Sequence, residues 1–167
     1  VIARGDCQVP CDLIIHGRYE AIRQVTRHFC KTNRVMPLGI ISDADVSTKG
    51  QVFIDSLNAG GLRANPESNI CPYDETLYSS IEKRYAAISE MLKQSFSKYQ
   101  YDSILCNNDE TAALVYKWLS GQGLSVPEDV ALVGADDTHL ASLFNPALAS
   151  ICRKDEELVL MVGQMLF

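Results

Sequence analysis

The stretch SILCNNDETAALVYKWLSGQGLSVPEDVALVGADDTHLASLFNPALAS, residues 103–150, decides the fold class of this chain. It opens on a short apolar run, Ser103 to Cys106, which has the length of a buried strand. A helical segment follows, and either Asn108 or Asp109 is placed to cap its first turn. A second apolar run, Val130 to Val133, comes next. Strand, helix and strand in this order predict a right-handed crossover that joins two parallel strands.

The same alternation extends toward the start of the chain. Apolar runs of strand length occur at Leu13 to Ile15 and at Leu38 to Ile41. Apolar residues at helical spacing predict three helices: one through Ile22, Val25 and Phe29; one through Val52, Phe53, Ser56 and Leu57 that ends at Gly60-Gly61; and the longest from about Thr76 to Phe96, with Asp74 as its N-cap. We therefore expect an α/β fold whose mainly parallel sheet is covered by helices on both faces.

Composition limits the classes of function that this chain can perform. Its 167 residues are 47% hydrophobic, which is enough to build a core. The formal net charge of -6 argues against a nucleic-acid-binding surface on this segment, because such a surface needs clustered Lys and Arg. The cysteines form no Cys-x-x-Cys pair, and we expect reduced thiols; they are Cys7, Cys11, Cys30, Cys71, Cys106 and Cys152.

Patterns typical of catalysis, metal binding and membrane insertion are scarce in the sequence. Ser-x-x-Lys occurs at Ser80 to Lys83 and at Ser95 to Lys98, but two matches on one predicted helix show how unspecific that pattern is. There is no Gly-x-Ser-x-Gly elbow and no phosphate-binding Gly-x-x-x-x-Gly-Lys. The histidines, His16, His28 and His139, are far apart. No signal peptide opens the chain, and no apolar run reaches the length of roughly 18 residues that a membrane span needs. We expect a soluble protein that is not an enzyme and holds neither a metal nor a cofactor.

The ordered motifs after Ser103 resemble the effector-binding domain of LacI/GalR-type bacterial transcription regulators. The motifs that carry this resemblance are Asn108-Asp109, Gly123-Leu124, Val126-Pro127-Glu128-Asp129-Val130 and Val133-Gly134-Ala135-Asp136-Asp137-Thr138. Nearer the start, Gly17 to Ala21 stands where that family usually has an Asp-Asn pair. Lys49 to Phe53 stands where it has Arg-x-x-Gly-Phe, so that a lysine replaces the family's ligand-binding arginine.

The resemblance implies a two-lobed architecture of the periplasmic-binding-protein type I, with a ligand cleft between the lobes. On this basis residues 1–36 would finish the N-terminal lobe, residues 37–149 would form most of the C-terminal lobe, and residues 150–167 would cross back. The chain begins without Met, at Val1-Ile2-Ala3. We expect it to be part of a longer protein whose DNA-binding domain precedes this segment.

Two candidate ligand-binding residues follow predicted strands, at the edge where parallel sheets collect ligands. By resemblance, the Asn108 amide hydrogen-bonds a sugar hydroxyl; the alternative is a plain helix cap, a role that Asp109 could take instead. Asp136 resembles the acid with which the family grips ligand hydroxyls, since a carboxylate accepts from two hydroxyls at once. The alternative for Asp136 is an ordinary turn residue.

Four further candidates are less closely tied to the motifs. Lys49 and Asp45 lie one helical turn apart and could either bind ligand or form a structural salt bridge with each other. Arg4 stands close to where the family often supplies another polar contact, and an acidic or phosphorylated sugar would fit a site that contains both Arg4 and Lys49. Tyr73 could stack on a sugar ring or simply be buried.

The leading hypothesis is the effector-sensing domain of a cytoplasmic, dimeric bacterial transcription regulator. Its effector would be a sugar-like molecule, and it would reach operator DNA through a domain absent from this chain. Apolar residues of the helix Val52 to Leu57, or Leu158, Val162 and Leu166 of the tail, could form a dimer seam, although core packing is the simpler use. The alternatives are an exported, transport-associated sugar-binding protein and, behind it, an enzyme on a doubly wound sheet.

Overall fold

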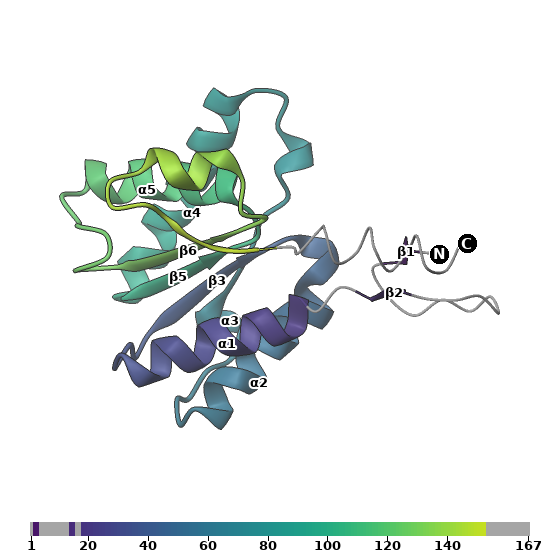
Figure 1. The fold of residues 1–167 in the computed structure, drawn as a ribbon. Helices are drawn as coiled ribbons and strands as arrows, with labels where there is room; N and C mark the ends of the chain where they lie inside the picture. The colour runs from purple at the N-terminus through teal and green to yellow at the C-terminus, as the bar shows by residue number, and fades with distance from the viewer. Residues whose placement is uncertain (1, 4–13, 16–17, 153–167) are drawn as a thin grey trace.

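A five-stranded parallel sheet is the centre of the molecule (Figure 1). The computed structural model describes residues 2–3, 14–15 and 18–152. The strand order is β4-β3-β5-β6-β7, and the strands are β3 (Pro37–Ile41), β4 (Ile70–Pro72), β5 (Ser103–Cys106), β6 (Ala131–Ala135) and β7 (Ala149–Ile151). Register is set by pairs such as Leu38 with Ile104, and Ile104 with Leu132. Two residues each of β1 (Ile2–Ala3) and β2 (Ile14–Ile15) form a separate parallel pair.

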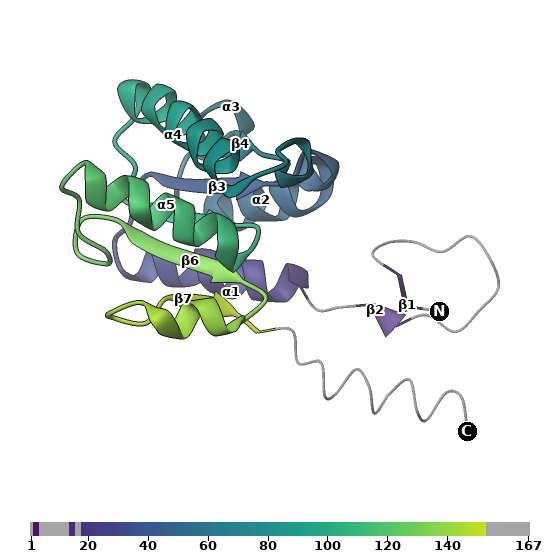
Figure 2. The same ribbon diagram turned by 90° about the horizontal axis from the view of Figure 1, so that it is seen from above.

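Helices cover both faces of the sheet, with α1 and α2 on one face and α4 and α5 on the other (Figure 2). The helices are α1 (Arg18–Lys31), α2 (Gln51–Ala59), the short α3 (Pro66–Asn69), α4 (Ile81–Lys98) and α5 (Asp109–Gly121). Shorter turns lie between them: η1 (Asp43–Asp45), the π-helical η2 (Val46–Gly50), η3 (Glu75–Leu77) and η4 (His139–Leu143).

Alternation along the strands divides the core into two layers. In β5, Ile104 packs toward α4 and α5, and its neighbour Leu105 packs toward α1 and α2. The first layer includes the buried residues Leu38, Ile40, Ile88, Leu92, Val115 and Leu119, and the second includes Ile22, Phe29, Phe53, Ile54 and Leu57. Because both faces are covered, the strands are continuously apolar, and the predicted parallel α/β class is confirmed.

The start of the longest helix was predicted wrongly. The helix α4 begins at Ile81, and the side chain of Ser80 caps it by accepting from the Lys83 N–H. Asp74 instead caps η3, where its carboxylate accepts from the backbone and the hydroxyl of Thr76. Leu77 is 71% exposed, so it does not continue the apolar stripe that suggested the earlier start.

Helix α1 packs with the five-stranded sheet, although it falls within the segment expected to finish a first lobe. Its buried Ile22 and Phe29 contact the layer that contains Phe53 and Leu57 of α2. We therefore place α1 with the body formed by the sheet. Phe53 and Leu57 are fully buried in this core, which leaves them unable to form a dimer seam. The tail residues considered for such a seam lie outside the described residues.

Candidate ligand-binding site

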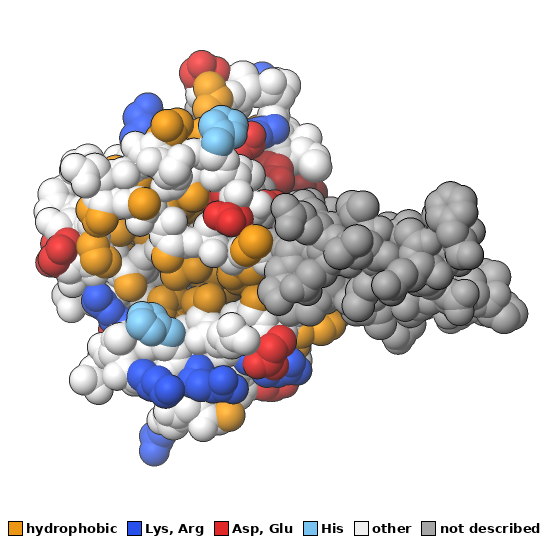
Figure 3. Space-filling view, viewed as in Figure 1, with side chains coloured by type: hydrophobic (Ala, Val, Ile, Leu, Met, Phe, Trp, Pro, Cys, Tyr) orange, Lys and Arg blue, Asp and Glu red, His pale blue; other side chains and the backbone are white. Residues whose placement is uncertain are grey.

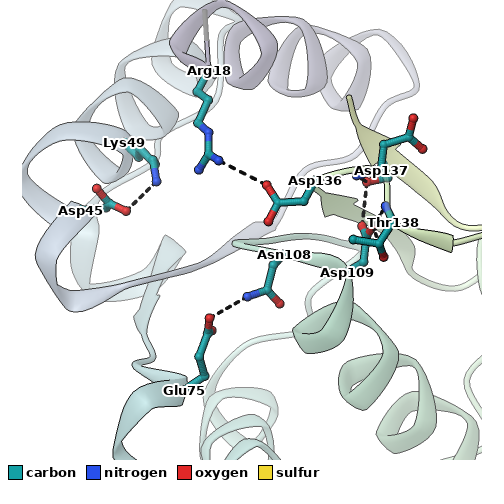
Figure 4. A network of polar contacts seen from close by, with 10 residues as sticks. Arg18, Asp45, Lys49, Glu75, Asn108, Asp109, Asp136, Asp137 and Thr138 are labelled. Atoms are coloured by element: carbon teal, nitrogen blue, oxygen red, sulfur yellow. Dashed lines mark hydrogen bonds and ion pairs between the residues drawn. The ribbon is translucent and has the colours of Figure 1, made fainter. Parts of the chain in front are cut away.

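Polar side chains from four loops gather at the carboxyl edge of the sheet (Figure 4). Because all five strands are parallel, the loops that follow them meet at the same edge, where open α/β sheets bind ligands. Lys49 follows β3, Glu75 follows β4, Asn108 follows β5 and Asp136 follows β6. Arg18, the first residue of α1, reaches the same region (Figure 4).

Asn108 caps α5 and contacts the neighbouring loop at the same time. Its Oδ1 accepts from the Thr111 N–H at 2.8 Å, so Asn108, and not Asp109, is the N-cap. Its Nδ2 donates to Oε1 of Glu75 at 2.9 Å. The other oxygen of Glu75 accepts from Nδ2 of Asn107, also at 2.9 Å. One carboxylate therefore holds two neighbouring amides at the end of β5.

Asp136 projects its carboxylate from a left-handed turn after β6. Its φ is 90° and that of Asp137 is 47°, a region that Asp tolerates better than most residues. Oδ1 of Asp136 accepts from Nη2 of Arg18 at 3.2 Å, and both side chains are largely shielded from solvent. This ion pair connects the loop after β6 to the start of α1.

The fully buried carboxylate of Asp109 holds that left-handed turn in place. It accepts from the backbone N–H of Thr138 at 2.6 Å, from the Thr138 hydroxyl at 2.9 Å and from the Ser150 hydroxyl at 2.6 Å. Gly134 packs so closely against Asp109 that a Cβ at this position would overlap the carboxylate. Hydrogen bonds to a charged acceptor are the stronger kind, so Asp109 fixes the geometry from which Asp136 projects.

Lys49 and Asp45 form the salt bridge that the sequence predicted as one of their two uses. The distance from Lys49 Nζ to Asp45 Oδ2 is 2.5 Å, and the Lys49 side chain is only 19% exposed. The pair lies in η1 and η2, which replace a regular helix after β3. Lys49 consequently faces the edge of the sheet, not open solvent (Figure 4).

Tyr73 is 4% exposed and stacks on Tyr78, with 5.8 Å between the ring centroids. Burial is the largest influence on its hydroxyl and raises the pKa to about 12, while Arg84 opposes this effect and Glu75 adds to it. Among the described residues the hydroxyl finds no hydrogen-bond partner. Tyr73 thus adopts the buried packing that was one of its predicted alternatives. Arg4 lies outside the described residues.

Three polar residues of this edge were missed by sequence reasoning: Arg18, Glu75 and Asn107. Glu75 follows β4, a strand of three residues that ends in Pro72 and has no recognisable apolar run. Arg18 precedes the apolar stripe of α1, and the available signal was its place in Gly17 to Ala21, the segment that stands where the family usually has an Asp-Asn pair. Asn107 stands directly beside the predicted Asn108, so its proximity was the available signal.

Residues 18–152 and the two short strands contain neither a cluster of metal ligands nor a helix that could span a membrane. No three His, Cys, Asp or Glu side chains gather there as metal ligands. In the same residues, no helix has both the length and the apolar character required to cross a bilayer.

The sequence of this chain matches a known domain family and known proteins. Residues 46–167 match the model of the periplasmic binding protein-like domain. The chain is 25% identical over 156 residues to the HTH-type transcriptional repressor PurR of Pasteurella multocida, a match that covers 93% of this chain and 44% of that protein. The chain therefore spans less than half the length of this curated relative.

Solved structures with the same fold include transcription regulators. A putative LacI-family regulator from Sanguibacter keddieii superposes with a TM-score of 0.80 at 20% identity, covering 99% of this chain and 61% of that one. The regulator CelR in complex with cellobiose gives a TM-score of 0.74 at 23% identity, covering 95% of this chain and 47% of that one. The fold described here is thus the fold of these regulators.

Proposed function

Because this chain belongs to the family of periplasmic binding protein-like domains, with LacI-family regulators as its relatives, we propose that it senses a small effector for a bacterial transcription regulator. The effector is a sugar or a sugar derivative that binds at the carboxyl edge of the sheet, in the cleft between two lobes. The observation that carries this proposal is the convergence of Lys49, Glu75, Asn108 and Asp136 from four successive loops.

The chemistry of these side chains suits a molecule rich in hydroxyl groups. Asp136 and Glu75 offer carboxylate oxygens that accept from hydroxyls, and Lys49 and the Asn108 amide offer donors. Each of these groups already has a polar partner, as in the pairs Arg18–Asp136 and Glu75–Asn108. A ligand that replaces these contacts with its own hydroxyls leaves each of these polar groups with a hydrogen-bond partner. Such an exchange supports binding with small rearrangements of side chains.

Binding at this edge would regulate transcription through linkage. A ligand that binds one arrangement of the lobes more tightly raises the population of that arrangement. If the two arrangements differ in their affinity for operator DNA, the ligand therefore changes the affinity of the protein for DNA. We propose that the intact regulator is a cytoplasmic homodimer and that it contacts operator DNA through a domain outside this chain. The acidic net charge supports the last point, because phosphate binding requires clustered cations.

The transport-associated binding protein is the less favoured alternative. The relatives named above are regulators of transcription, and their similarity spans nearly the whole chain. We also propose that the protein has no catalytic activity, because the polar groups of the edge are suited to hydrogen bonding and the sequence lacks both the Gly-x-Ser-x-Gly elbow and the phosphate-binding Gly-x-x-x-x-Gly-Lys.

A thermal-shift screen of sugars and sugar derivatives on the intact protein tests the proposal. A ligand that binds only the folded state raises the melting temperature. We expect Asp136→Asn, which retains a side chain that tolerates a positive φ, to abolish the shift. Asp137→Asn, the same change at the adjacent exposed position, serves as the matched control and should preserve it. An unchanged shift in Asp136→Asn would remove this carboxylate from the site.

A further inference from the structure

An open hollow of about 590 Å³ lies between α1 and α2. It is on the opposite side of the sheet from α4 and α5. None of the residues that line it belongs to the candidate ligand site; they are Arg23, Arg27, Cys30, Lys31, Val52, Asp55, Ser56, Ala59 and Gly60. The function proposed above therefore leaves this hollow without a role.

One wall of the hollow is a row of cations. Arg23, Arg27 and Lys31 recur every fourth residue on α1, so they share one side of the helix and extend along roughly 12 Å at 1.5 Å per residue. All three are exposed, and Arg23 forms an ion pair with Glu20 of the same helix at 3.4 Å. Figure 3 shows Lys and Arg side chains gathered over α1 in the lower part of the view. This concentration of positive charge contrasts with the net charge of -6 for the whole chain.

The facing wall and the floor carry little charge to neutralise that row. Asp55 is the one acid in the lining, and its carboxylate already accepts from Gln51 at 2.7 Å. The floor includes the half-buried Val52 and Cys30, and the Ser56 hydroxyl donates to the Val52 carbonyl at 2.6 Å. The result is a trough with a basic rim, in which Val52, Cys30 and Ala59 supply the apolar surface.

We propose that this hollow is a docking surface for an acidic amphipathic helix of a partner protein. A trough between two helices accepts an apolar helix face, and acids spaced at one helical turn on the occupant would pair with the row on α1. An open trough would bury little of a small anion, because small-molecule sites enclose most of their ligand. A two-fold contact between copies of this chain through the hollow would bring the cation rows of the two α1 helices against each other, which charge repulsion opposes.

Fluorescence anisotropy on the intact protein tests this proposal. The probe is a fluorescein-labelled helical peptide in which glutamate and leucine each recur every fourth residue, and a peptide with lysine in place of glutamate is its matched control. We expect the acidic peptide to bind, more weakly at higher salt, and the basic peptide not to bind.

Two variants localise the binding. Arg27→Glu should weaken it by about tenfold, whereas Lys93→Glu, an equal change of charge at an exposed position of α4, should not alter it. Ala59→Tyr fills the hollow without changing the charge and should weaken binding to a similar degree. The proposal is overturned if Ala59→Tyr binds normally, if inorganic phosphate displaces the peptide at equal charge concentration, or if Arg27→Glu changes only self-association.

Discussion

Replacement of the buried Asp109 by alanine should destabilise the protein more than replacement of an exposed acid of the same helix by alanine. The carboxylate accepts three hydrogen bonds, two from Thr138 and one from Ser150. Each hydrogen bond to a charged group contributes roughly 1.5–3 kcal/mol, but the two hydroxyls can turn toward other acceptors, whereas the Thr138 N–H cannot. We therefore expect the free energy of unfolding to fall by about 3–5 kcal/mol.

Urea denaturation measures this loss, with fluorescence of Trp118 as the probe. Trp118 is the single tryptophan of the chain and is 8% exposed, so its emission reports on the packing around α5. The control is Glu110→Ala, which removes an exposed acid paired with Arg84 and should cost under about 1 kcal/mol. An equal loss of free energy of unfolding in the two variants would show that Asp109 does not fix the loop after β6.

Three further predictions concern tyrosine and cysteine side chains. Tyr73→Phe should leave the free energy of unfolding unchanged or slightly raised, because the buried hydroxyl has no hydrogen-bond partner among the described residues. Tyr101→Phe should lower the free energy of unfolding by about 1 kcal/mol, because the Tyr101 hydroxyl donates to the Ser68 carbonyl at 2.8 Å. Urea denaturation curves of the two variants measure this difference. Burial raises the pKa of both hydroxyls to about 12, above their value of about 10 in the unfolded chain, so their contribution to stability is present below pH 10 and lost as the pH rises toward 12. The chain has seven tyrosines, so the measurement is the difference in tyrosinate absorbance between the folded wild type and each Phe variant. A difference that already appears at pH 10 would contradict this prediction. The exposed Cys152 should react with a thiol reagent in the native protein. Cys106 should react only after unfolding, because complete burial raises the pKa of its thiol. Mass spectrometry of the labelled peptides identifies which cysteine reacts.

Elements with a strong local pattern could be predicted from the sequence. The strands β3 and β5 are continuous apolar runs with polar residues beyond them, and their positions were predicted to within one residue. Asn108 and Asp136 were identifiable because each follows such a strand. The salt bridge of Lys49 with Asp45 was predicted as an alternative from their spacing of one helical turn.

Elements that depend on distant contacts could not be predicted in this way. The edge strands β4 and β7 are three residues long, and pairing with β3 and β6 defines them more than their composition does. Glu75 follows one of these short strands, so its approach to Asn108 was invisible. Arg18 meets Asp136 across 118 positions of sequence, and no local pattern indicates such a pair.

The start of α4 could not be predicted from apolar periodicity, because some of the apolar residues in the pattern are exposed to solvent. Leu77 and Ile81 fit a helical stripe by spacing, yet they are 71% and 51% exposed. Apolar spacing alone does not distinguish a buried face from a solvated one. The cap at Ser80 was the better signal, because its hydroxyl accepts from the Lys83 N–H and closes the first turn.

We propose that Asn108 and Asp136 hold the same small molecule, and the decisive measurement is calorimetric titration of the intact protein with that molecule. Asn108→Ser retains a capping side chain for α5 but removes the amide, so it separates ligand binding from helix stability. We predict that Asn108→Ser and Asp136→Asn each weaken effector binding by at least about tenfold, and that the double variant loses less than the sum of the two losses because both groups contact one ligand. Wild-type affinity in the double variant would show that neither Asn108 nor Asp136 holds the ligand.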